Sequence, residues 1–438
     1  MPDIRTIRVF SASNFRSAFG GRRLRKFSPD DLVVERPGVW WDQLARTHLG
    51  HPQRVTGDPT LTRRCESSDE RRPTGHSPAP TASRERQRTA RPRDGNYEAL
   101  GVPLSHKAAS AYAQAAAMSS LDDYFEEDDG FSGLAVHSVG YTAGAEDERV
   151  VIYVTRGSRK ALTSLPQEVG DIAVETAVMG RLKAGPAPAM AGHGVGHLFE
   201  HQGRIACGSS CAPSTENYSG TFGALLRSGS RLLALSNNHV FAACNHTPVG
   251  MPILAPSTMD ARPGRRAPTE FCRHEQLVEL RSGDPGLVPL MRLDTAIAGV
   301  SDEAVVTSWQ GDSTDGFDTP ITTISPSSGL KVKKIGRTTG LTTGTVEALV
   351  PTPWILPYKS GKFTATVWFT DTWTVRSNDG DPFALPGDSG SLIVTEDGSS
   401  AVGLLFAINN KGQYGILMPI ERVLSAFGNL QLVSNHGV

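Results

Sequence analysis

Short apolar runs separated by turn residues dominate the sequence after residue 205. The runs 221–226 and 231–236 are joined by Ser-Gly-Ser, a spacing typical of a β-hairpin. Further runs that alternate in polarity or are rich in β-branched and aromatic residues occur at 330–335, 345–350, 365–375, 392–394 and 401–407, before a helical pattern at 419–427. Runs this short do not make a helical bundle. The sequence predicts a mainly β fold in which residues 205–438 form two packed barrels.

The first part of the chain has a different composition. With 438 residues, the chain is long enough for two or three domains. Residues 1–95 carry 19 Lys or Arg against 11 Asp or Glu, whereas the remainder carries 25 against 34. Residues 1–96 contain too few apolar side chains to offset chain entropy, so we predict a disordered basic tail. Nucleic acid is an alternative partner for such a tail, although a solvated arm is the commoner outcome.

A small α+β domain is predicted between the tail and the barrels, at residues 97–184. An alanine-rich run at 108–118, with Ser105 as candidate N-cap, indicates a helix. Strand-like runs follow at 134–142, 149–155 and 172–178. The segment has no cluster of titratable residues, which favours a scaffold or docking role. Gly-Pro-Ala-Pro-Ala at 185–189 then indicates a linker, which we extend over 185–204.

Metal binding and membrane insertion are both disfavoured. Histidines recur every four residues at 193, 197 and 201, but glycines at 192, 194 and 196 oppose the helix that would align them. We therefore predict no metal and no cofactor. The chain has five cysteines and neither an apolar leader nor a run of about 18 apolar residues. A sparse, odd set of cysteines suits a reducing compartment, so we expect free thiols and a soluble cytoplasmic protein.

A serine between two glycines, Gly387-Asp388-Ser389-Gly390, is the first candidate for chemistry. Such a turn can expose the hydroxyl and aim backbone N–H groups beside it, as acyl transfer requires. The same four residues also describe an ordinary polar turn before a strand. The motif needs partners elsewhere in the chain.

His239 and Asp294 are the candidate partners. His239 directly follows an apolar run, and Asp294 stands at the head of another, where a buried carboxylate needs a hydrogen-bond donor or a cation. The order is His, Asp, Ser, with the first two in the first half of the β region and Ser389 in the second. A cleft between two barrels would bring base, carboxylate and hydroxyl together as a catalytic triad.

The sequence resembles the chymotrypsin-like (trypsin-like) serine peptidases at three places. These are SNNHV at 236–240, DTAIA at 294–298 and PGDSGS at 386–391, and GRTTG at 336–340 is similar to a turn of bacterial streptogrisin-type members. Residues 97–430 look most like bacterial trypsin-like peptidases similar to the plant narrow-leaf proteins. The resemblance implies a serine endopeptidase with His239 as base, Asp294 orienting it and Ser389 as nucleophile. It also implies oxyanion-hole N–H groups from Gly387 and Ser389.

The resemblance further implies where substrate side chains bind. The position six residues before the nucleophile is Phe383, and Phe406 and Ala407 fall on the expected pocket wall, which favours an apolar or small side chain over a basic one. The implied partner is a protein or peptide substrate, with no membrane, and an oligomer is compatible with the sequence. The alternative function is a degenerate peptidase fold that acts only as an interaction protein, with a basic tail that binds nucleic acid.

Asp388 also needs a partner if it is buried. In zymogens of the family, a new N-terminal amine neutralises this acid, but no activation site precedes residue 221 here. We predict that Lys334 pairs with Asp388, because alternation along its strand points it inward, with Arg337 as the second candidate.

Overall fold

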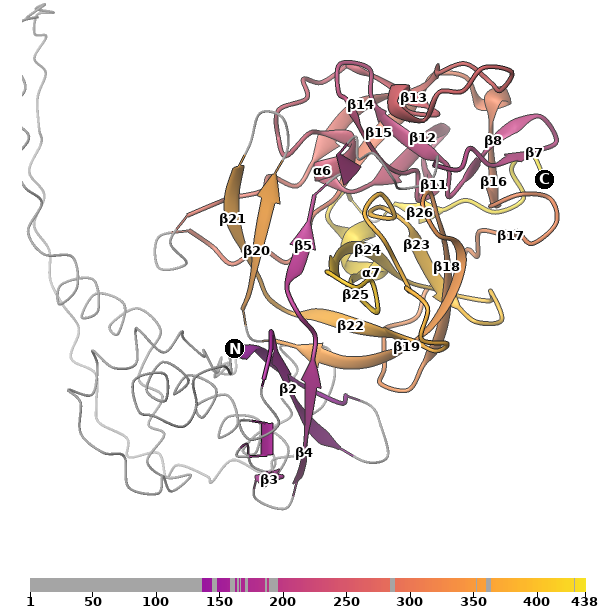
Figure 1. Ribbon diagram of the computed structural model, residues 1–438. Helices are drawn as coiled ribbons and strands as arrows, with labels where there is room; N and C mark the ends of the chain where they lie inside the picture. Colours follow the sequence, from indigo (N-terminus) through magenta and orange to yellow (C-terminus); the bar gives the residue numbers. More distant parts are fainter. Residues whose placement is uncertain are drawn as a thin grey trace, which may run out of the picture. The chain divides into compact units, whose positions relative to one another are not determined.

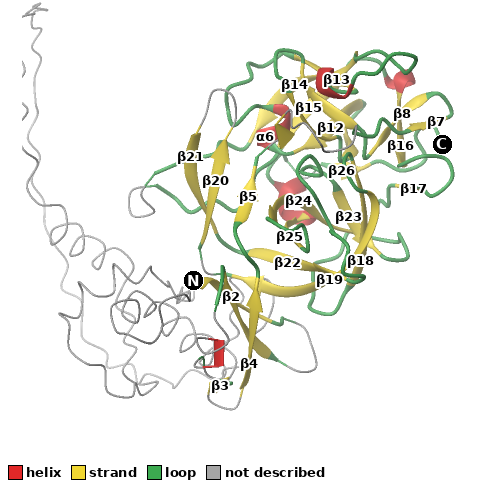
Figure 2. Cartoon of the chain, in the orientation of Figure 1, coloured by secondary structure: helices red, strands yellow, loops and turns green. Residues whose placement is uncertain are grey.

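The computed structural model describes residues 136–438 except for 144–147, 158–161, 164, 166, 170–171, 186, 189–195, 284–287, 352, 360–363 and 429. The predicted tail and the alanine-rich helix lie outside the described residues. The described part is mainly β, as predicted, with strands linked by short loops (Figures 1 and 2). Its α-helices are α6 (Asn238–Phe241) and the predicted closing helix, α7 (Ile420–Ser425).

A closed antiparallel barrel occupies the C-terminal half. Its strands follow the order β18-β23-β24-β25-β22-β19, and β19 pairs again with β18 to close the ring. The strands are β18 (Lys331–Gly336), β19 (Gly340–Val350), β22 (Thr372–Ser377), β23 (Leu392–Thr395), β24 (Ala401–Asn409) and β25 (Tyr414–Pro419). All nine residues of β24 are buried, because this strand has packed side chains on both faces. The turn that contains Ser389, residues 387–390, lies just before β23.

A second antiparallel sheet contains the predicted hairpin. Its order is β26-β11-β12-β15-β14-β13-β9-β10-β6. The strands are β6 (Ala187–Pro188), β9 (Ser210–Pro213), β10 (Tyr218–Thr221), β11 (Ala224–Ser228), β12 (Arg231–Ser236), β13 (Pro252–Ala255), β14 (Thr269–Leu277), β15 (Ala296–Val300) and β26 (Gln431–Leu432). A buried cluster that includes Phe222, Phe241 and Phe271 fills this half. His239, three residues after the end of β12, is therefore attached to a well-packed sheet.

Two smaller sheets complete the fold. One has the order β17-β16-β8-β7 and the other is the hairpin β20–β21. Their strands are β7 (Glu200–His201), β8 (Arg204–Cys207), β16 (Val306–Gln310), β17 (Phe317–Asp318), β20 (Trp354–Lys359) and β21 (Thr364–Phe369). The run predicted at 365–375 is thus divided between β21 and β22, which belong to different sheets. Asp371, with φ +54°, turns the chain between them.

The strands expected in a small separate domain continue the barrel sheet. β1 (Val136–Tyr141) pairs with β19, β2 (Arg149–Val154) pairs with β1, and β4 (Ile172–Val178) runs parallel to β2 and pairs with β3 (Glu168–Val169). β5 (Leu182–Ala184) then pairs with β24. Residues predicted as linker contribute β6, β7 and the start of β8. The domain boundaries stay a prediction, but backbone hydrogen bonds join this part to both halves.

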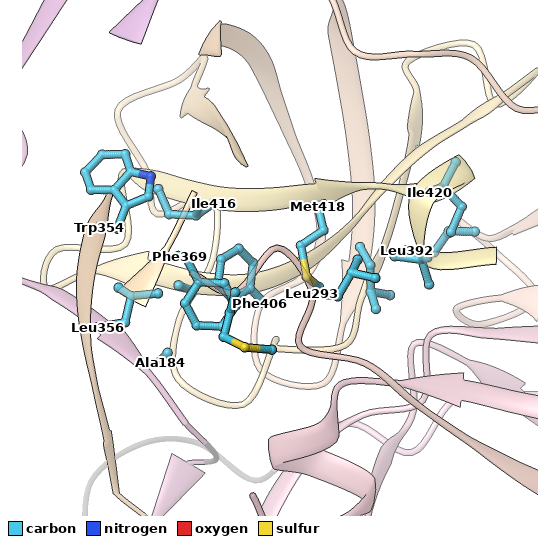
Figure 3. Packing of buried hydrophobic residues seen from close by; sticks show 14 of the residues in the cluster. Ala184, Leu293, Trp354, Leu356, Phe369, Leu392, Phe406, Ile416, Met418 and Ile420 are labelled. Carbon is cyan, nitrogen blue, oxygen red and sulfur yellow. The ribbon is translucent and has the colours of Figure 1, made fainter. Parts of the chain in front are cut away.

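One apolar cluster spans the two main sheets. It joins β11 and β12 residues such as Leu226 and Leu235 to barrel residues such as Leu392 and Met418. Figure 3 shows part of it, with Leu293, directly before Asp294, close to Met418. Burial of this shared surface holds the histidine half against the serine half.

A buried ion pair also links the two sheets. Arg337 follows β18, and Asp260 ends the 3-10 turn η3 (Thr258–Asp260) between β13 and β14. Arg337 Nε donates to Asp260 Oδ2 at 2.7 Å, and Nη2 contacts Oδ1. Ser210 and Ser219 donate to the same carboxylate at 2.5 and 2.7 Å. Burial raises the pKa of Asp260, but the hydrogen bonds from Arg337 and the serines outweigh it and lower the pKa to about 2.

We predict that Asp260→Asn destabilises the protein by about 3 kcal/mol at pH 7, because it leaves the Arg337 charge buried and unpaired. The native pKa of Asp260 lies below its value in an unfolded chain, so this stability is complete above about pH 4 and is lost as the pH falls toward 2. Urea midpoints at pH 7 and pH 3 measure the effect. The gap between wild type and variant should narrow at pH 3, whereas Asp315→Asn, at an exposed site, should match wild type at both.

Candidate active site

His239 is held rigidly at the end of β12. Ser236 is the last residue of that strand, and His239 lies on the single turn of α6, fully buried. Asn237 Nδ2 donates to Asp294 O at 2.7 Å and so ties the start of the turn to the segment before β15. This hydrogen bond fixes the position of Asp294 relative to β12 and α6.

Asp294 accepts two hydrogen bonds from His239. The ring Nδ1 donates to Oδ2 at 2.5 Å, and the backbone N–H donates to Oδ1 at 3.1 Å. Both side chains have 0% exposure, so water does not compete for the carboxylate. This is the arrangement predicted from the sequence. A carboxylate on Nδ1 fixes the tautomer that leaves Nε2 free to accept a proton.

Tyr358 is a third partner of Asp294, and the sequence did not reveal it. Its hydroxyl donates to Asp294 Oδ2 at 2.7 Å, and its ring lies edge-on to the His239 ring with centroids 5.8 Å apart. Burial and the Asp294 charge raise the pKa of Tyr358 well above its ordinary value, so it stays a donor. Tyr358 comes from the hairpin β20–β21, which is a separate two-stranded sheet. No spacing in the sequence relates residue 358 to residue 294.

The turn that contains Ser389 is hydrogen-bonded to Thr221, the last residue of β10 in the second sheet. Ser389 O accepts from Thr221 N at 2.9 Å, and Gly387 O accepts from Thr221 Oγ1 at 2.8 Å. Gly390 has φ +96°, and a Cβ there would lie 2.3 Å from Ser236 Oγ. The turn thus packs against Ser236, three residues before His239, and only glycine fits at that contact.

The hydroxyl and the imidazole are not hydrogen-bonded to each other. Ser389 Oγ donates to Phe406 O at 3.5 Å, and the side chain of Ser389 is 7% exposed. Nε2 of His239 is buried and has no hydrogen-bond partner within the described part of the chain. The contact with Phe406 is at the outer limit of a hydrogen bond, so little hydrogen-bond energy is lost when the hydroxyl leaves it.

The backbone N–H groups of Gly387 and Ser389 are also available. Among the described residues, neither N–H donates a hydrogen bond, whereas Asp388 N bonds to Leu385 O and Gly390 N bonds to Leu405 O. Gly387 has φ +103°, a left-handed conformation that turns its peptide within the loop. Two free donors beside Ser389 are what an oxyanion needs.

Asp388 is fully buried and pairs with Lys334, which confirms the preferred partner over Arg337. Lys334 Nζ lies 3.4 Å from Oδ2, and both side chains have 0% exposure. Burial lowers the pKa of Lys334, and the Asp388 charge opposes that shift. The carboxylate also accepts from Thr338 N, Thr339 Oγ1 and Leu385 N at 2.7, 2.8 and 2.9 Å. Arg337 instead pairs with Asp260.

The three predicted pocket residues do not lie in one cluster. Phe383 is fully buried in the cluster that contains Val346 and Val375, and its ring lies 2.9 Å from where a Cβ on Gly344 or Gly415 would be. Phe406 and Ala407 belong to the cluster shared by the two main sheets. The assignment of a substrate pocket to these residues stays a prediction.

Other candidate features have structural surroundings. His197 stacks on Phe199 and His201 on Trp309, while His193 lies outside the described residues. Cys207, Cys211, Cys244 and Cys272 are buried free thiols, and Cys65 is not described. In the described segments, no group of three His, Cys, Asp or Glu side chains is arranged to hold a metal. No helix there is long and apolar enough to cross a membrane.

Comparison with protein families gives one match. Residues 294–416 match the model described as the Nal1 C-terminal domain. This stretch lies within the region that resembles peptidases similar to the narrow-leaf proteins, and it includes Asp294 and Ser389. No curated protein matches the sequence.

Several solved serine proteases are similar in structure at low identity. A glutamic acid-specific serine protease is 17% identical, with a TM-score of 0.36, and the match covers 52% of this chain and 100% of that one. Thermobifida fusca protease A is 18% identical, with a TM-score of 0.36 and coverage of 53% and 100%. An α-lytic protease homologue, N4, is 20% identical, with a TM-score of 0.34 and coverage of 52% and 99%. The fold resembles that of chymotrypsin-like serine proteases.

Tyr358→Phe should slow the reaction of Ser389 with a fluorophosphonate roughly 10-fold while thermal stability changes little, because Asp294 loses one of its side-chain donors. Tyr153→Phe is the matched control, since it removes a buried hydroxyl that donates to Glu347 Oε2 at 2.7 Å. Equal labelling rates for the two variants would mean that Tyr358 does not position the Asp294 carboxylate.

Lys334→Met should lower the labelling rate at least 10-fold and reduce stability by about 3 kcal/mol, because Asp388 keeps its charge without a cation. Lys331→Met, three residues earlier on the same strand and exposed, should have no effect on either quantity. Labelling rates and urea midpoints measure both variants. Wild-type reactivity in Lys334→Met would contradict a role for this ion pair in shaping the Ser389 turn.

Proposed function

We propose that the chain is a serine endopeptidase that hydrolyses peptide bonds through Ser389, His239 and Asp294. The observation that carries this proposal is the buried His239–Asp294 pair, with Nδ1 and Oδ2 2.5 Å apart and Nε2 without a partner. A histidine held in this way by a carboxylate is a general base with a fixed tautomer. Its unpaired Nε2 belongs to the half of the fold against which the serine turn packs.

In the proposed reaction, Ser389 Oγ leaves Phe406 O and gives its proton to His239 Nε2 as it attacks the scissile carbonyl carbon. The N–H groups of Gly387 and Ser389 stabilise the oxyanion that forms. The imidazolium then returns the proton to the leaving amine, and an acyl-enzyme remains on Ser389. Water attacks that ester by the same route, with His239 as base, and releases the carboxylic acid product.

The hydrogen-bond and ion-pair partners of Asp294 and Asp388 support the proposal. Asp294 has donors from His239 and Tyr358, so it can stabilise the imidazolium without becoming protonated. Asp388 is held by Lys334 and by backbone N–H groups of Thr338 and Leu385. This pairing uses a lysine within the chain, so the turn needs no new N-terminus.

The full-length chain should take up one fluorophosphonate per molecule, read by intact mass after prolonged incubation. Ser389→Ala and His239→Ala should each fail to label and should lose peptide hydrolysis by about as much as the double variant, on the order of 10⁶ in kcat. Ser391→Ala, two residues away, is the control for general reactivity of the loop. A wild-type chain that stays unlabelled, or additive losses in the double variant, would favour a degenerate fold that serves only as an interaction protein.

A further inference from the structure

The edge of β24 beside the nucleophile is occupied by the chain itself. β5 runs antiparallel to β24, with Leu182 opposite Asn409, Lys183 opposite Ile408 and Ala184 opposite Ala407. The neighbour of Ala407 is Phe406, whose carbonyl accepts the Ser389 hydroxyl. β23 pairs with β24 only up to Leu404, so residues 407–409 would be a free edge without β5. Figure 1 shows β5 between β20 and β24.

A second strand from the same segment pairs with β10, the strand that ends at Thr221. β6 runs antiparallel to β10, with Ala187 opposite Ser219 and Pro188 opposite Tyr218. Thr221, two residues further along β10, donates its N–H to Ser389 O. The two edges that flank the nucleophile turn thus both carry strands from residues 182–188.

The two paired strands are close to each other in the sequence. Ala184 and Ala187 are three residues apart, a separation that an extended chain spans with at most about 10 Å. Their partners, Ala407 and Ser219, belong to different halves of the fold, which meet at the nucleophile turn. A polypeptide substrate that reaches Ser389 in extended form needs the same two edges for its backbone hydrogen bonds.

β5 is held by more than backbone pairing. Asn410 N donates to Arg181 O at 2.8 Å, and Asn409 Nδ2 donates to Met179 O at 2.7 Å. Leu182 and Ala184 are buried at 3% and 9% exposure, whereas Lys183 between them is exposed. Ala184 belongs to the buried cluster that includes Leu356 and Phe406 (Figure 3).

We propose that β5 and β6 form an intramolecular inhibitory segment, which must leave these edges before an extended polypeptide substrate can reach Ser389. This regulation rests on the proposed peptidase function. Because the segment is part of the chain, its effective concentration at the edges is in the millimolar range, and a substrate at micromolar concentration competes poorly. The short strand length and the small side chain of Ala184 allow release without loss of the barrel, whose strands close on themselves.

A reversible crosslink tests the proposal in the full-length chain. Lys183 and Ile408 are directly opposite each other, at the separation that a disulfide between antiparallel strands can bridge. In Lys183→Cys/Ile408→Cys, oxidation should lower the rate of peptide hydrolysis at least 10-fold, and a reductant should restore it. The single variant Lys183→Cys is the control and should respond to neither treatment. Equal hydrolysis by the oxidised and reduced double variant would overturn the proposal.

A releasing variant provides the opposite change. Leu182→Asp/Ala184→Asp places charges in the apolar cluster and should raise peptide hydrolysis at least 10-fold, whereas Lys183→Asp, at the exposed position of the same strand, should not. Unchanged hydrolysis in a folded releasing variant would contradict the proposal. The extent of crosslinking is measured by mass spectrometry, and this measurement does not depend on whether the chain hydrolyses peptides. A double variant that crosslinks fully while no variant labels with fluorophosphonate would overturn the proposed function and, with it, the regulation of that function.

Discussion

Every polar group of Thr221 is engaged where the two halves of this fold meet. Its N–H donates to Ser389 O, its hydroxyl donates to Gly387 O and accepts from Arg337 N, and its carbonyl accepts from Ser236 Oγ. The residue is fully buried, so water cannot replace any of these hydrogen bonds. The positions of the nucleophile turn, the strand before His239 and the turn after β18 all depend on this one side chain and its peptide group.

Three carboxylates near the junction of the two halves are buried, and each has different partners. Asp294 is satisfied by His239 and Tyr358, Asp388 by Lys334 and backbone N–H groups, and Asp260 by Arg337 and serine hydroxyls. Each pairing brings together segments that are distant in the sequence. A buried charge without its partner costs several kcal/mol, so these pairs restrict how the halves can dock as well as where the reactive groups lie. The same contacts therefore position the polar groups of the site and hold the two halves of the fold together.

The strands that precede the second sheet in the sequence pair with both halves of the fold. β1 to β4 extend the barrel sheet, β5 pairs with β24 of the barrel, and β6 pairs with β10 of the second sheet. β6 lies in the predicted linker, which begins at residue 185, and the segment 182–188 is thus paired through β5 and β6 at its two ends. Peptide recognition by strand addition would use those same hydrogen bonds, so binding of substrate and of this segment exclude each other.

The sequence by itself determined the mainly β fold, most strand positions and the order His239, Asp294, Ser389, and it favoured Lys334 over Arg337 as the partner of Asp388. These follow from local patterns, because alternation fixes which face a side chain occupies and a glycine-flanked serine fixes a turn. Only the tertiary structure decided that Tyr358 reaches Asp294, that Arg337 binds Asp260, and that Phe383 packs apart from Phe406. It also decided that β5 pairs with β24 and β6 with β10. Those contacts join strands far apart in the chain, and their register depends on packing that no local pattern encodes.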